Sequence, residues 1–80
     1  MNTEKIVLNV IKKNLMIDEI FDTNVPLMSL DNADSMTQMI IISEIEQSIG
    51  QTFSFEELME IELISDLIKL SKNKVSDSTR

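Results

Sequence analysis

The sequence predicts an all-α fold, a small four-helix bundle made of three main helices and one short helix, with a long first loop. Apolar residues recur at intervals of three and four rather than two, which favours helices over strands. The chain has one Gly and one Pro, too few turn residues for a β-rich domain. With 80 residues, 42% of them hydrophobic, it has material for one core and is too apolar for a disordered acidic segment. We expect one domain over residues 1–80, with its core at about 4–72 and a flexible polar tail at 73–80.

The first helix is expected at residues 3–15, with Asn2 or Thr3 as its N-cap. Four apolar residues share one face at helical spacing: Val7, Val10, Ile11 and Leu15. The connection over residues 16–34 is long for a compact domain. Apolar residues are scattered along it, namely Ile17, Ile20, Phe21, Leu27 and Leu30. This pattern predicts a loop that is held against the core.

The second helix is expected at residues 35–49. Asp34 or Ser35 can cap its start, and Gly50 stands where a left-handed C-cap is needed. Its buried stripe is predicted to consist of Ile41, Ile42, Ile45 and Ile49. Gln38 is the polar exception on that side.

After Gly50, Phe53 and Phe55 are expected to anchor a loop. Ser54 followed by Glu57 fits a capping box and predicts a short helix at about residues 55–60. A last helix is expected at about residues 63–72. Its inward-facing residues are predicted to be Ile64, Leu67, Ile68 and Leu70.

The charge balance restricts the possible partners. Seven Lys and Arg against 14 Asp and Glu give a net charge of −7, which argues against nucleic acid and favours a basic protein surface. No apolar run approaches the length that spans a membrane, and the first residues do not resemble a signal peptide. We expect a cytoplasmic monomer without a membrane partner.

The residue types also restrict the chemistry. The chain has neither Cys nor His, which excludes disulfides, thiolate metal sites and the usual catalytic triad. An EF-hand loop counted from Asp31 fails, because its positions 3, 6 and 12 would be Ala33, Met36 and Ile42. We expect neither catalytic residues nor a metal site.

The segment before the second helix, Leu-Asp-Asn-Ala-Asp-Ser-Met at residues 30–36, places Ser35 at the start of an amphipathic helix with acidic residues beside it. By itself the segment leaves two interpretations open: an ordinary N-cap serine, or an exposed hydroxyl that is modified. The whole chain resembles an acyl carrier protein. In that family a Leu-Gly-x-Asp-Ser-Leu motif opens the second helix, and Asp34-Ser35-Met36 corresponds to its Asp-Ser-Leu core.

The resemblance covers about residues 4–70. It includes the apolar pattern of the first helix, the loop segment at 26–30, and the buried positions of the later helices, where Phe53, Ile61, Ile64, Leu67 and Ile68 fit. The segment departs from the family motif in three ways. The Gly is missing, one extra residue follows Leu30, and Met36 stands in place of the Leu. Asn32 tolerates left-handed geometry and can replace the Gly.

The resemblance implies that Ser35 carries 4′-phosphopantetheine, installed from coenzyme A by a phosphopantetheinyl transferase. The arm would hold acyl groups as thioesters for acyl- or ketosynthase-type and acyl-loading enzymes. The chain would then be a discrete, non-catalytic carrier of a fatty-acid, polyketide or hybrid polyketide/peptide pathway. The sparse acids of the second helix favour a specialised pathway. An aminoacyl carrier and an unmodified acidic adaptor with the same fold are the alternatives.

Partner-binding residues are expected near Ser35. Family members present acids along the second helix, but here the positions next to Ser35 are apolar. The predicted surface is an apolar contact with an acidic rim, formed by Met36, Met39, Ile40, Glu44, Glu46, Glu56 and Glu57. Packing of Ile40 against the loop is the alternative for that residue. Whether the aliphatic core opens to hold an acyl chain stays open at this point.

Overall fold

The computed structural model describes residues 2–19 and 21–78. Within these ranges the chain forms four α-helices and one 3-10 helix, with no strand. The elements in chain order are α1 (Thr3–Leu15), η1 (Leu27–Ser29), α2 (Ser35–Ile49), α3 (Phe55–Glu60) and α4 (Ile64–Ser78). The predicted all-α fold, with three main helices, a short helix and a long first loop, is confirmed.

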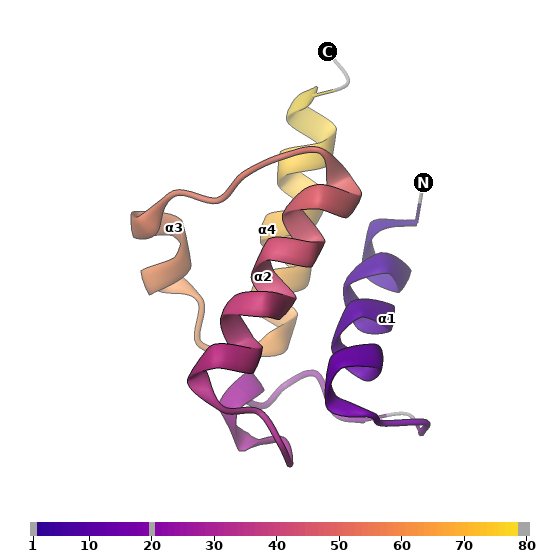
Figure 1. Cartoon of the computed structure of the whole chain (residues 1–80). Helices are drawn as coiled ribbons and strands as arrows, with labels where there is room; N and C mark the ends of the chain where they lie inside the picture. Colours follow the sequence, from indigo (N-terminus) through magenta and orange to yellow (C-terminus); the bar gives the residue numbers. More distant parts are fainter. Residues whose placement is uncertain (1, 20, 79–80) are drawn as a thin grey trace.

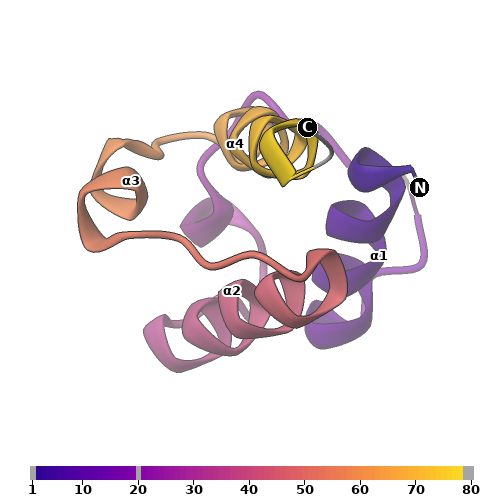
Figure 2. The same cartoon turned by 90° about the horizontal axis from the view of Figure 1, so that it is seen from above.

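Three helices enclose the core. α1 packs against both α2 and α4 and runs antiparallel to them (Figure 1). Figure 2 shows α3 set apart from this group, on the side opposite α1. The core consists of Val7, Val10, Ile11, Leu15, Leu27, Ala33, Ile41, Ile45, Ile49, Phe53, Ile64, Leu67 and Ile68. The predicted inward faces are therefore confirmed, with Ile42, Ile61 and Leu70 only partly buried at the margin of the core.

The helix ends follow the capping residues. The Asn2 side chain accepts the Lys5 N–H at 3.0 Å and caps α1. The predicted capping box of α3 is present, with Ser54 and Glu57 bonded reciprocally. Gly50 ends α2 in the left-handed conformation, at φ 72°. Because a left-handed residue lets the chain turn sharply, α2 stops at Gly50 and the chain crosses toward α3.

The long first loop is held against the core, as predicted. Leu27 is buried, and four further apolar residues of the loop are partly buried: Ile17, Phe21, Val25 and Leu30. Ile20 lies outside the described residues. The loop is also tied to the start of α4, where Ile64 N–H donates to the Val25 carbonyl at 3.0 Å and Ser65 N–H to Thr23 at 2.8 Å. These contacts position the segment that leads into α2.

Two sequence predictions need correction. The last helix does not end at residue 72 but continues to Ser78, because Val75 packs against the core and Lys74 lies 2.9 Å from the Glu57 carboxylate. Residues 79 and 80 of the expected tail lie outside the described residues. Phe55 does not anchor the loop, since 75% of it is exposed, whereas Phe53 is buried as expected.

We expect Gly50→Ala to lower the free energy of unfolding by about 1 kcal/mol, because a Cβ is strained in the left-handed conformation. No atom lies within 4 Å of the added Cβ, so the loss comes from the backbone alone. Urea denaturation measures it. Ser48→Ala, an exposed change on the same helix, is the control, and equal stabilities of the two variants would contradict the expectation.

Candidate functional site

Asp34 is the N-cap of α2. The Oδ1 of Asp34 accepts the Thr37 N–H at 2.8 Å, and its carbonyl accepts the Gln38 N–H at 3.0 Å. The Thr37 N–H is the main reason that the pKa of Asp34 lies below its usual value of 3.8. Ser35 follows as the first helical residue and is exposed. Within the described residues its hydroxyl has no hydrogen-bond partner, so the N-cap interpretation of Ser35 does not hold.

The turn before the cap depends on Asn32. This residue has φ 68°, in the left-handed region, which confirms that it can stand where the carrier motif has Gly. Ala33 N–H donates to the Leu30 carbonyl at 3.3 Å, and Asp34 N–H to the Asn32 carbonyl at 3.1 Å. Ala33 is buried. Ala33 therefore faces the core, whereas Asp34 and Ser35 lie at the surface.

A hollow of about 480 Å³ opens beside Ser35, between α2 and α3. It is lined by Ser35, Gln38, Met39, Ile42, Ser43, Glu46, Leu58 and Ile61. We call it the outer hollow. A smaller one of about 170 Å³, the inner hollow, shares Gln38, Ile42 and Ile61 with it and reaches the buried Leu27, Ile64 and Leu67.

Sequence reasoning did not assign Leu58 to the site and gave Ile61 only a buried position in the fold. The spacing of three residues between Leu58 and Ile61 could have indicated that both face the same side of the α3 segment.

The expected apolar contact beside Ser35 is at the surface. Met36 and Met39 are each 73% exposed, and Ile40 is 45% exposed. The alternative, in which the loop covers Ile40, would bury this side chain, whereas nearly half of it is exposed. Met59 of α3 is also exposed. Large apolar side chains gathered at a surface often mark an interface.

The predicted acidic rim is largely engaged within the protein. Glu44 accepts hydrogen bonds from the side chains of Lys13 and Asn14, and both bonds lower its pKa. Glu46 accepts the Phe53 N–H at 2.8 Å. Glu57 closes the capping box and pairs with Lys74, and these bonds lower its pKa too. Glu56 is exposed, and no partner for it exists among residues 2–19 and 21–78.

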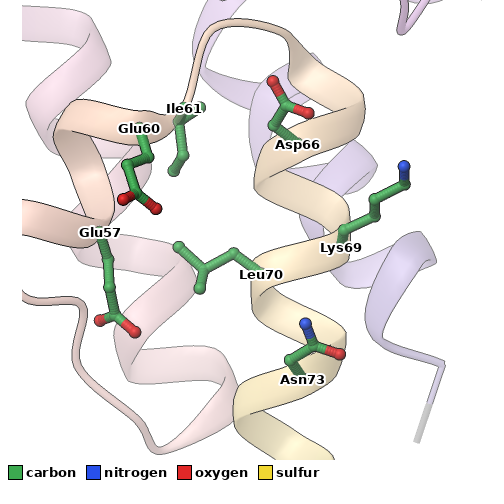
Figure 3. A pocket seen from close by; sticks show the side chains of 7 residues that line it. All are labelled: Glu57, Glu60, Ile61, Asp66, Lys69, Leu70 and Asn73. Atoms are coloured by element: carbon green, nitrogen blue, oxygen red, sulfur yellow. The ribbon is translucent and has the colours of Figure 1, made fainter.

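A third hollow, of about 300 Å³, lies between α3 and α4. Figure 3 shows Glu57, Glu60 and Ile61 on the α3 side, with Leu70 extending toward them from α4. Asp66, on its α4 side, accepts the backbone N–H groups of Leu63 and Glu62. Among the described residues, no three side chains of the metal-binding types lie close enough to hold a metal ion.

An exposed hydroxyl without a partner, at a helix start and beside an apolar hollow, is suited to a carrier domain. Residues 5–71 match the model of the phosphopantetheine attachment site family. The chain therefore belongs to this family, whose members carry covalently attached 4′-phosphopantetheine.

Domains of this kind are generally non-catalytic carriers that work with a phosphopantetheinyl transferase and synthase-type enzymes. No curated protein and no solved structure matches the chain. In the described part of the chain, no helix combines the length and apolar character needed to cross a bilayer.

The pKa of Asp34 leads to a prediction about pH. Asp34→Asn keeps a good N-cap but removes the charge. Since the folded-state pKa of Asp34 is lowered, its ionisation stabilises the protein above the unfolded-state value, and this contribution disappears as the pH falls through the folded-state pKa. We expect the stability advantage of wild type over Asp34→Asn to shrink as the pH falls below 3.8. Urea denaturation at a series of pH values measures it, and an advantage independent of pH would count against this role.

Proposed function

We propose that the protein is an acyl carrier and that Ser35 bears the 4′-phosphopantetheine. The observation that carries this proposal is the exposed Ser35 hydroxyl, which has no partner in the described structure because Asp34 performs the capping. The positive end of the α2 dipole favours a phosphate at this position. Asp34 opposes it through like charge, so a cation or a basic transferase surface would assist the transfer.

The attachment step is a phosphoryl-type substitution. The Ser35 oxygen forms a bond to the phosphorus of the coenzyme A phosphate that bears pantetheine, and the pyrophosphate bond breaks. Adenosine 3′,5′-bisphosphate leaves, and the hydroxyl proton passes to a base of the transferase. The chain has no Cys, so the thiol that forms thioesters is supplied by the attached arm.

The two hollows are suited to shelter the acyl chain. Half of the eight residues that line the outer hollow are apolar, with Met39 and Ile42 from α2 and Leu58 and Ile61 opposite, and Ile42 and Ile61 also line the inner hollow. Cavities close in size to the inner hollow take up a molecule of about six carbon atoms. Burial there would remove the chain from water, a favourable change for each methylene. Ser35 lies on the rim of the outer hollow, so an arm attached to it starts at the opening.

We place the carrier in a polyketide or hybrid polyketide/peptide pathway in preference to fatty-acid synthesis. The first turn of α2 contains no acidic residue, and the carboxylate of Glu44 farther along is paired with Lys13. A partner is expected to contact Met36, Met39 and Ile40 and to meet the charge of Glu56. The acids Glu44, Glu46 and Glu57 would add to the rim while staying paired. Cytoplasmic location and monomeric state stay predictions.

Attachment at Ser35 predicts a change in mass. Incubation with coenzyme A and a broad-specificity transferase should add one phosphopantetheine to wild type and none to Ser35→Ala, as read by intact mass spectrometry. Ser43→Ala, an exposed serine that lines the same hollow, should be modified like wild type. No gain with several transferases would favour the unmodified adaptor, and a gain that persists in Ser35→Ala would exclude Ser35.

The apolar contact predicts a loss of partner recognition. Ile40→Glu should slow modification by the transferase roughly fivefold to tenfold, because a charge would be buried against an apolar partner surface. Ile40 does not line either hollow, so it tests docking alone, whereas Met39→Glu would also disturb the hollow.

Gln47→Glu adds the same charge at another exposed position of α2 and serves as the control. Circular dichroism checks that all variants keep their helices. Equal initial rates for wild type and Ile40→Glu would refute the apolar docking contact.

A further inference from the structure

Gln38 is a polar residue that lines both hollows. It lies three residues after Ser35, one turn along the same face of α2. The other two residues that line both the outer and the inner hollow, Ile42 and Ile61, are apolar. Gln38 is therefore the polar side chain at the junction through which an acyl chain would pass from the outer hollow to the inner one.

The Gln38 amide has no partner in the described protein. Its backbone N–H donates to Asp34, but no hydrogen bond of its side chain lies within residues 2–19 and 21–78. The amide offers two donors and one carbonyl acceptor. Gln38 is only partly buried, so water can satisfy it while the hollows are open. A saturated chain would displace that water without replacing its hydrogen bonds, which is unfavourable.

We propose that Gln38 is a specificity-determining residue that favours acyl chains with a hydroxyl or keto oxygen close to the thioester over saturated chains. This inference rests on the proposed function. The order of the two hollows explains why the favoured oxygen would be one near the thioester. The outer hollow, lined by exposed residues such as Met39 and Ser43, would receive the end of the arm, whereas the inner hollow reaches the buried core. The junction at Gln38 then meets the first carbons beyond the thioester.

The arm itself also has amide groups that could bond to Gln38. The two sources of the hydrogen bond are separable, because the arm is present in the unloaded carrier and the acyl oxygen is not. The side-chain amide signals of Gln38 in ¹⁵N-labelled protein report on both. We expect these signals to move when 3-hydroxyoctanoyl cargo is attached and to stay in place on attachment of the arm alone.

The test uses the full chain loaded from octanoyl- or 3-hydroxyoctanoyl-coenzyme A by a broad-specificity transferase. Intact mass confirms loading first, and hydroxylamine cleavage then measures how well each thioester is sheltered. In wild type the hydroxyacyl thioester should be cleaved about fivefold more slowly than the octanoyl one, an effect of the size one hydrogen bond provides. Gln38→Leu should reverse this order, and the exposed Gln47→Leu should keep it.

The outcomes separate the two proposals. Absence of any mass gain overturns the proposed function and the inference together. Normal loading with equal protection of the two cargoes in wild type overturns the inference alone. The same holds if Gln38→Leu keeps the preference for the hydroxyacyl chain. Gln38 signals that move fully on attachment of the arm would assign the amide to the arm and not to the cargo.

Discussion

The hydrogen bond from the Thr37 N–H to the Asp34 carboxylate determines how the start of α2 can be used. A helix start needs acceptors for its first N–H groups, and a serine in the capping position would supply one with its own oxygen. Here the carboxylate does so from the preceding residue, and the left-handed Asn32 turns the chain so that it can. The Ser35 hydroxyl is thereby left exposed and without a structural task. Capping is thus performed by Asp34, and the residue proposed for modification is its neighbour.

The position of α3 explains why a hollow lies beside that hydroxyl. None of its residues is buried, and it is held by partly buried Leu58, by the following Ile61 and by the pair of Glu57 with Lys74. Hollows lie on both of its sides, toward α2 and toward α4, and Figure 3 shows the one toward α4. A short helix with so few contacts does not fill the space against α2. The core itself is built mainly by the other three helices, and none of its buried residues comes from α3.

The sequence predicted what depends on local pattern. Helical spacing identified the buried residues of α1 and α2, and capping residues identified the ends at Asp34 and Gly50. The misses came from contacts between distant residues. The polar run after Lys72 resembles a tail, and only the folded chain brings Val75 to the core and Lys74 to Glu57. Likewise, the hollow needs α3 to face α2, an arrangement that no spacing along the chain reveals.

The same distant contacts change the meaning of the net charge of −7. Counting charges suggested an acidic rim for basic partners, yet Glu44, Glu46 and Glu57 each serve the fold, by joining α2 to α1, holding the Phe53 backbone and closing the α3 cap with Lys74. A partner that engaged them would have to replace these bonds, and exposed ion pairs gain little to offset such a loss. Their field still steers encounter at a distance. In the proposed docking, close contact would fall to the exposed Met36, Met39 and Ile40 beside Ser35. Charge would then bring partners near, and the apolar surface would hold them.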